Sequence, residues 1–473
     1  MLQSRSDVRA VVGKLEFRSG RALALFVACS AAAWALAFLP AHEGLSEAGR
    51  RALFTLLWAA GLWVTEAIPA YATALGVISV EIALLGRPHG SFAKHPHDWE
   101  IFVAPWASPL IWLFFGGFVL AAAAAKSGLD KWFCAAVLGR FGTRPAMILL
   151  GAMSLTFCFS MFVSNTATAA MMLAVMAPLV SRSEGGDPFG KAMLLAIPFA
   201  ASLGGMGTLI GTPPNAIAAG ALKGPHEVSF LAWMLLALPP ALVANLLVWC
   251  FLCWRYPSRR KRINLDEMIA SAAEAPQMER WRKLLVLIVF AATVGLWMTG
   301  PWHGLPTAVI AFLPLSVLTM TGVLRAEDIR ALPWEVLLML AGGLALGVGV
   351  AETGLAPWIV GHLPQDSLGP VALTFVLCYL TATLSNVMSN TAAANILVPI
   401  GAALAPDNPG PYVVPIALAA SCALCLPIST PPNALAYASG RLNARDFLAG
   451  GLLVGALAPA VCVLWSMLAY GWL

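Results

Sequence analysis

The chain has 473 residues, of which 60% are hydrophobic and 11% are charged, and its mean hydropathy is +0.81. Soluble domains are about 45–50% apolar and about 25% charged, so this composition excludes a water-soluble globular protein and indicates an all-α polytopic membrane protein. The net charge of +5 is explained by basic loops at a membrane surface, so we expect no nucleic-acid partner.

The first half of the chain is predicted to contain several membrane helices and two interrupted segments. Residues 1–20 are polar and basic and form the expected cytoplasmic N-terminal segment. A first repeat is predicted at 21–254, with scaffold helices at 21–125, a hairpin at 145–180, a broken helix at 191–222 and a further helix at 229–254.

The second half follows the same order of elements. A basic linker at 255–283 precedes a second repeat, predicted at 284–473. We expect scaffold helices at 284–351, a hairpin at 367–403, a broken helix at 411–440 and a last helix at 446–471. The two halves therefore indicate an internal duplication.

Two short motifs carry this duplication. Residues 164–166 and 389–391 are both Ser-Asn-Thr, in the middle of the two predicted hairpins. Downstream, residues 211–215 read Gly-Thr-Pro-Pro-Asn and residues 429–433 read Ser-Thr-Pro-Pro-Asn. A single motif of either kind is usually an interhelical hydrogen bond or a kink, but paired copies in the same order indicate a functional site.

The distribution of lysine and arginine predicts the topology. With two re-entrant hairpins and a cytoplasmic N-terminus, 23 of the 28 basic residues lie on the cytoplasmic side and five outside. This arrangement has about eleven transmembrane helices and places the C-terminus in the periplasm of a bacterial inner membrane. Because the offset between the repeats is odd, they are expected to have inverted topology, with broken helices near the midplane.

The motifs suit the joint binding of an anion and a hard cation. Ser, Thr and Asn side chains offer oxygen ligands for sodium, and amide and hydroxyl groups donate hydrogen bonds to carboxylates. Neither motif contains Lys, Arg or His, so the anion's charge would be met by cations and helix N-termini. Glu66, Glu81 and Glu352 are possible proton carriers, although snorkelling or a helix-end contact is the more common explanation for such residues.

These paired motifs resemble those of the divalent anion:sodium symporters, as do residues 63–69 and 115–118. The resemblance implies a homodimer whose transport domain moves against a scaffold in an elevator-like manner. It implies substrate-binding residues Asn165, Thr166, Thr212, Pro213, Asn390, Thr391, Thr430 and Pro431. It also implies two sodium sites, formed by Ser160, Ser164, Asn165 and Gly211 and by Ser385, Met388, Asn390 and Ser429.

The expected function is sodium-coupled transport of C4-dicarboxylates such as succinate, malate and fumarate, and the chain is not expected to be an enzyme. Alternatives of the same fold are a sodium-independent dicarboxylate exchanger and a sulfate or citrate carrier. A cation/proton antiporter would require buried Asp or Glu at the broken helices, where the motifs have none. An intramembrane hydrolase would require a His or Lys base beside the motif serines, and the motifs contain neither.

Overall fold

The computed structural model describes residues 5–88, 90–129, 133, 137, 139–181, 187–263, 278–363 and 368–471. Every regular element in these ranges is a helix, and they contain no strand. The prediction of an all-α fold is therefore confirmed. The chain divides into two compact units, and each unit takes residues from both halves of the sequence.

The first unit comprises the described residues of Met1–Trp106 and Leu338–Leu363. Ser46 caps its second helix, since the Ser46 hydroxyl accepts a hydrogen bond from Gly49 N at 2.9 Å. Its elements are α1 (Arg5–Phe38), α2 (Glu47–Thr65), α3 (Ala70–Leu84), the 3₁₀ turns η1 (Asp98–Phe102) and η2 (Ala104–Ala107), most of α17 (Trp334–Glu352), and α18 (Leu355–Gly361).

The three glutamates singled out in the sequence all lie in this unit and have different environments. Glu66 ends α2 in the left-handed region with φ 47° and is exposed, and Glu352 is exposed at the end of α17. Glu81 on α3 is fully buried, and its carboxylate oxygens have no hydrogen-bond partner among the described residues. Two of the three glutamates are therefore helix-end residues.

The second unit comprises the described residues of Ala107–Leu337 and Pro364–Leu473, and it contains both motif pairs. Its first-half elements are α4 (Pro109–Ser127), η3 (Gly139–Phe141), α6 (Pro145–Ser160), α7 (Asn165–Ser181), α8 (Phe189–Gly205), α9 (Pro213–Ala221), η4 (Gly224–His226) and α10 (Phe230–Arg255). Its second-half elements are α12 (Arg280–Met298), α13 (Gly300–His303), α14 (Thr307–Ile310), α15 (Phe312–Met320), α16 (Ala326–Arg330), α19 (Pro370–Ser385), α20 (Asn390–Leu404), α21 (Gly410–Ala420), α22 (Pro431–Tyr437) and α23 (Ala444–Ala469).

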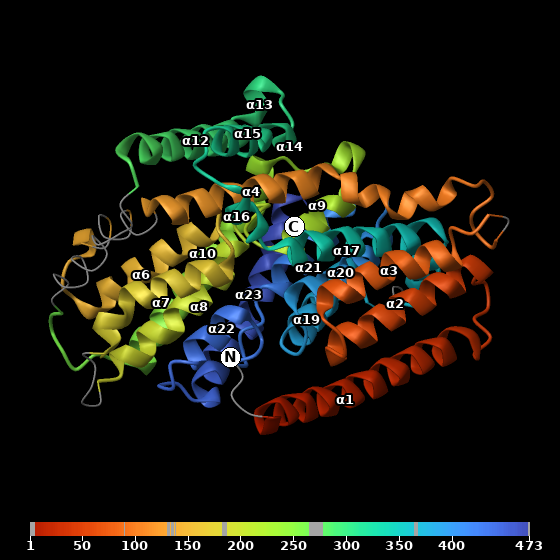
Figure 1. Cartoon of the computed structure of the whole chain (residues 1–473), viewed down its shortest axis with the longest axis horizontal. Helices are drawn as coiled ribbons and strands as arrows, with labels where there is room; N and C mark the ends of the chain where they lie inside the picture. Colours follow the sequence, from red (N-terminus) through yellow and green to blue (C-terminus); the bar gives the residue numbers. More distant parts are fainter. Residues whose placement is uncertain are drawn as a thin grey trace. The chain divides into compact units, whose positions relative to one another are not determined.

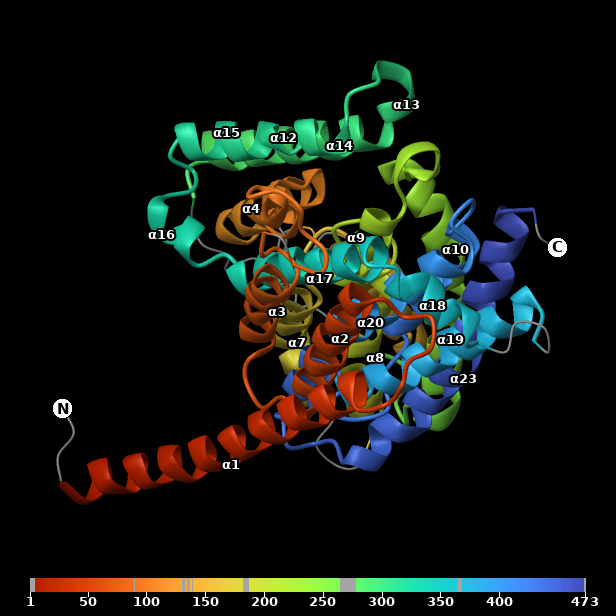
Figure 2. The ribbon, with the colours of Figure 1, turned by 90° about the vertical axis from the view of Figure 1, so that its right-hand side faces the viewer.

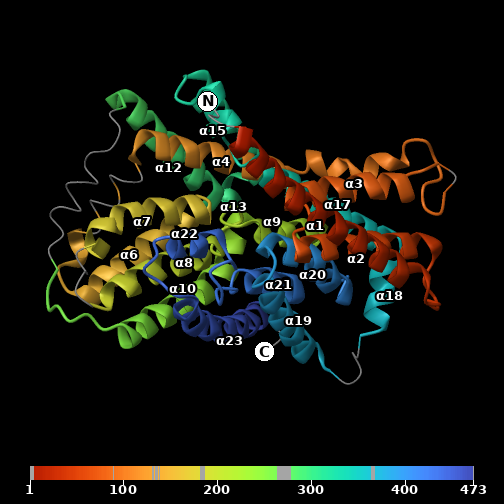
Figure 3. The same cartoon turned by 60° about the horizontal axis from the view of Figure 1, so that its bottom comes forward.

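Helices α8 and α21 form the centre of this unit. Nearly all residues of α8 and all of α21 are buried. Helices α6 and α7 pack on α8, and α19 and α20 pack on α21 in the same way. Each helix that follows a Pro-Pro break packs on helices from the other half of the sequence. Helix α9 packs on α20 and α21, whereas α22 packs on α7 and α8 (Figures 1 and 3).

A separate group of helices packs along α4. Helices α12, α14 and α15 contact α4 and one another, as Figure 2 shows. Lys126 at the end of α4 pairs with Asp328 of α16, with Nζ and Oδ2 2.5 Å apart. This ion pair fixes α16 against the end of α4.

Helix length separates two classes of apolar helix. Six helices of the described chain are long and apolar enough to cross a membrane, and eight further apolar helices have 10–17 residues. Helices α6 and α19 each have 16 residues, which at 1.5 Å per residue is about 24 Å, against about 30 Å for the hydrocarbon core. These hairpin helices are therefore shorter than a typical membrane span.

The close approach of α8 to α6 gives a first prediction. A Cβ at Gly204 would lie 2.7 Å from Phe157 Cα and 2.8 Å from its carbonyl carbon, and backbone atoms cannot move aside as a flexible side chain can. We expect Gly204→Ala to destabilise the protein by about 1–3 kcal/mol, measured as a lower thermal unfolding temperature in detergent.

The control for this substitution is Gly295→Ala on α12, where an added Cβ meets nothing within 4 Å. This variant should unfold at or above the wild-type temperature, because alanine favours helix. Equal behaviour of the two variants would contradict the tight α6–α8 contact.

Candidate binding site at two hairpin tips

Each Ser-Asn-Thr motif lies at the tip of a helical hairpin. In the first hairpin, α6 ends at Ser160 and α7 begins at Asn165. In the second, α19 ends at Ser385 and α20 begins at Asn390. Both tips have the same turn pattern over four residues. The duplicated sequence therefore forms a duplicated local structure.

The first tip gathers oxygen atoms from three segments. The buried Ser160 hydroxyl lies 2.6 Å from Asn165 Oδ1 and 2.7 Å from the carbonyl of Ala201 on α8. With the amide of Asn165 reversed, Nδ2 donates to Ser160 Oγ at 2.6 Å, to Ala201 O at 3.2 Å and to Gly211 O at 3.3 Å. This reversed orientation satisfies more partners, and it shows that acceptor oxygens surround the amide.

The second tip repeats this arrangement. The Ser385 hydroxyl lies 2.7 Å from Asn390 Oδ1 and 2.8 Å from the carbonyl of Ala420 at the end of α21. A hydroxyl has one proton, so it cannot fully satisfy both acceptors. While the asparagine Oδ1 faces inward, each tip therefore has more hydrogen-bond acceptors than donor protons.

The last residue of each Pro-Pro motif holds the preceding loop in place. Asn215 Nδ2 donates to the carbonyls of Gly205 at 2.9 Å, Met206 at 3.2 Å and Thr208 at 2.6 Å. Asn433 Nδ2 donates to two carbonyls of the equivalent loop, Leu424 at 3.3 Å and Leu426 at 2.9 Å. Both asparagines are fully buried. They satisfy carbonyls that the breaks in the helices leave without helical partners.

The threonines occupy the starts of helices. Thr212 and Thr430 precede α9 and α22 in extended conformation and are 4% and 3% exposed. Thr166 in the first turn of α7 is exposed, whereas Thr391 in the first turn of α20 is 8% exposed. Pro213 and Pro431 occupy the first positions of α9 and α22, where proline is well tolerated.

Not every residue expected at a sodium site joins the oxygen cluster at its tip. Ser160, Asn165 and Gly211 come together at the first tip, but the Ser164 hydroxyl accepts from Ala167 N at 3.3 Å and caps α7. At the second tip Ser385 and Asn390 are bonded, and Met388 is buried with 3% exposure. Ser429 is bonded to Asn386 of the tip at 3.0 Å.

Three residues of these networks were not among the predicted site residues. Asn215 and Asn433 had a signal in the sequence, because both motif copies end in asparagine. Asn386 had none, since the equivalent position in the first hairpin is Met161. A comparison of the two halves favours residues that the duplication preserved and overlooks those that differ.

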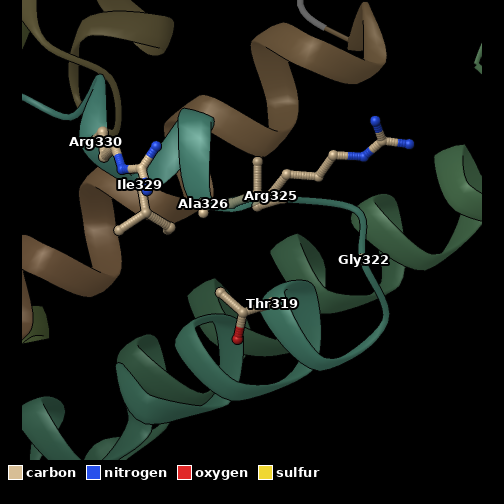
Figure 4. Close-up of a pocket in the computed structure, with 7 residues that line it drawn as sticks. Thr319, Gly322, Arg325, Ala326, Ile329 and Arg330 are labelled. Carbon is tan, nitrogen blue, oxygen red and sulfur yellow. The ribbon is translucent and has the colours of Figure 1, made fainter.

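A surface pocket of about 640 Å³ lies elsewhere in the second unit, at the end of α15. Figure 4 shows the guanidinium groups of Arg325 and Arg330 apart from one another there. Burial acts to raise the pKa of Asp328 nearby, but hydrogen bonds from Arg325 N and Lys126 outweigh it and leave the pKa below its usual value. The pocket contains no residue of either motif pair, so we do not assign the predicted site to it. Its lining residues are Thr319, Gly322, Leu324, Arg325, Ala326, Ile329 and Arg330.

The loop contacts of Asn215 give a second prediction. Asn215→Ala removes a donor that three carbonyls share, although Met206 O keeps another, from Trp233 Nε1. It should destabilise the protein by about 2–3 kcal/mol, against about 1–2 kcal/mol for Asn433→Ala. Asn215→Asp keeps the shape but turns an acceptor toward the carbonyls, so it should unfold at or below the temperature of the alanine variant. Thermal unfolding in detergent measures all three, and wild-type stability of Asn215→Asp would contradict the described bonds.

Comparison with known proteins identifies the family. A family model described as "Citrate transporter" matches residues 60–409. The "Sodium-dependent dicarboxylate transporter SdcS" of Staphylococcus saprophyticus is 32% identical over 458 residues, covering 89% of this chain and 86% of the relative. A protein of the same name from Staphylococcus aureus is 29% identical over 464 residues, with the same coverage.

A solved structure supports the fold independently. The YdaH transporter of Alcanivorax borkumensis matches with a TM-score of 0.54 and 15% identity, covering 84% of this chain and 97% of that chain. At this identity the match concerns the fold alone. The family model and the first relative each cover well over half of the chain. The chain is therefore a multi-pass membrane transporter, not an enzyme, and it belongs to the divalent anion:sodium symporter family that its paired motifs resemble.

Proposed function

We propose that this chain transports C4-dicarboxylates such as succinate, malate or fumarate across the bacterial inner membrane, coupled to sodium. The observation that carries the proposal is the pair of matching oxygen clusters, Ser160 with Asn165 and Ser385 with Asn390. Two equivalent tips suit a substrate with two carboxylates. The relatives named as sodium-dependent dicarboxylate transporters support the same substrate class.

The proposed sodium sites follow from the surplus of acceptor oxygens. At the first tip, Ser160 Oγ, Ala201 O and Gly211 O surround the amide of Asn165. A sodium ion in their midst would turn Asn165 Oδ1 inward as a fourth ligand, which directs Nδ2 outward to an anion. The full proposed sets are Ser160, Ser164, Asn165 and Gly211 for one ion and Ser385, Met388, Asn390 and Ser429 for the other.

This arrangement couples the two ligands. Without sodium, the inward nitrogen of Asn165 satisfies the tip oxygens and leaves the amide oxygen on the side of the anion. With sodium, a donor takes that place, and the ion adds positive charge beside the carboxylate. Sodium thus raises affinity for the anion, and by linkage the anion raises affinity for sodium to the same degree.

The proposed dicarboxylate ligands extend this site along the starts of four helices. Hydroxyls of Thr166 and Thr391 donate to the carboxylates, and the starts of α7 and α20 direct backbone N–H groups toward an anion. The proposed set is Asn165, Thr166, Thr212, Pro213, Asn390, Thr391, Thr430 and Pro431. We further propose that the hairpins are re-entrant, because their helices are short.

The remaining parts of the proposal concern the transport cycle. The repeats have inverted topology, the N-terminus is cytoplasmic and the C-terminus periplasmic, as the excess of basic residues on one side supports. The protein acts as a homodimer in which the motif-bearing hairpins move in an elevator-like manner. These features rest on the resemblance of the motifs to the symporter family.

Uptake of radiolabelled succinate into proteoliposomes tests the function. We expect wild-type uptake to require an inward sodium gradient. Asn165→Ala and Asn390→Ala should each reduce it at least about tenfold, because a hydrogen bond to a charged group contributes about 1.5–3 kcal/mol. The matched control is Asn245→Ala on α10, a buried asparagine outside both motifs, which should transport like the wild type.

The possible results separate the alternatives. Uptake that ignores sodium but needs internal dicarboxylate would replace symport with exchange at the same site. Sodium-dependent uptake of citrate or sulfate in place of succinate would overturn the proposed substrate and leave the proposed sodium coupling intact. Wild-type uptake by both motif variants would show that the hairpin tips are not part of the binding site.

A further inference from the structure

The side chain of Asn386 ties the tip of the second hairpin to the loop between α21 and α22. Its Oδ1 accepts hydrogen bonds from Cys425 N at 2.9 Å and from Ser429 Oγ at 3.0 Å. Its Nδ2 donates to Ala382 O of α19 at 2.8 Å. The oxygen of this carboxamide therefore bonds to the loop, and its nitrogen bonds to α19.

These bonds decide how the Ser429 hydroxyl is oriented. Its proton points to Asn386, where the carbonyl at 3.2 Å and Oδ1 at 3.0 Å both lie within reach. One lone pair accepts from Leu426 N at 3.0 Å. Since a hydroxyl has one proton and two lone pairs, one lone pair of Ser429 is left for a cation.

The first hairpin has no such carboxamide. The equivalent residue is Met161, whose side chain lies beside the loop, since a Cβ at Gly207 would be 3.2 Å from Met161 Cγ. There the Thr208 hydroxyl donates to the Met161 carbonyl. Glycines bring this loop close to the tip: a Cβ on Gly205 would overlap Asn165, and one on Gly211 would overlap Gly205. The contacts between tip and loop therefore differ between the two hairpins.

We propose that Asn386 is a positioning residue for the second sodium site. It holds the loop at 425–429 against the hairpin tip and directs a lone pair of Ser429 toward the ion, so this site is formed before sodium arrives. The two sodium sites are then built differently, since the first has no equivalent of Asn386. This inference rests on the proposed sodium coupling and adds a residue that neither motif contains.

The test is sodium binding to the purified, substrate-free protein. Thermal unfolding in detergent is followed as sodium chloride replaces choline chloride at constant ionic strength. The rise of the unfolding temperature with sodium is fitted for the dissociation constant, which is the sodium concentration at which half of the folded protein is occupied. Asn386→Met installs the residue of the first repeat and should raise this concentration at least tenfold. Asn386→Asp keeps oxygen acceptors for Cys425 N and Ser429, so it should stay within threefold of the wild type.

Two further measurements separate positioning from a general effect on folding. Val387→Met places a methionine at the same tip on an exposed residue, 54% accessible, and should respond to sodium like the wild type. The succinate KM of Asn386→Met at saturating sodium should stay near the wild-type value, because the residue acts on the ion. A lower unfolding temperature without sodium, with an unchanged sodium dissociation constant, would show a structural role only and overturn the inference.

The remaining outcomes distinguish this inference from the proposed function. A wild-type protein that binds succinate but shows no response to sodium would overturn the sodium sites and the role of Asn386 with them. A wild-type response that Asn386→Met leaves unchanged would overturn the role of Asn386 alone. Equal weakening by Asp and Met would also overturn it, because the acceptor oxygens would then be irrelevant.

Discussion

The structure depends on how unpaired backbone groups are satisfied where helices break inside an apolar protein. A break leaves carbonyls and N–H groups without helical partners, and the hydrocarbon region of a membrane supplies no water to replace them. Here the buried amides of Asn215 and Asn433 take up the carbonyls of the two loops. At the first hairpin tip, acceptor oxygens of Ser160, Ala201 and Gly211 surround the amide of Asn165. The same constraint that shapes the fold thus brings backbone and side-chain oxygens together at the hairpin tip.

Much of the fold and part of the site could be predicted from the sequence, because the chain contains two copies of each motif. The repeated motifs identified Asn165 and Asn390, and the resemblance to the symporter family added Ser160 and Ser385, with which they are in contact. The all-α fold followed from composition alone. The exchange of α9 and α22 between the halves could not be predicted, since both helices are short and apolar and could pack on many surfaces. The division into compact units could not be predicted from the sequence either, because its boundary falls near the start of a single helix, α17.

The residues that the sequence did not reveal are those that differ between the halves. Asn386 corresponds to Met161, and the glycines at 205 and 207 have no glycine counterparts in the loop before α22. The first tip contacts its loop through close backbone approach and the Thr208 hydroxyl, whereas the second uses the side chain of Asn386. Repeats that look alike at the level of motifs can therefore differ in the rigidity of their loops.

The crossed packing of α9 and α22 has a consequence for how the chain is made. Helix α9 packs on α20 and α21, which are synthesised more than 160 residues later. Until those helices have entered the membrane, the buried residues of α9 have no final partner, and α7 and α8 await α22 in the same way. The N-terminal half therefore cannot complete its folding during its own synthesis. Any cellular factor that protects nascent membrane proteins would meet this chain with its binding site still open and its first half unfinished.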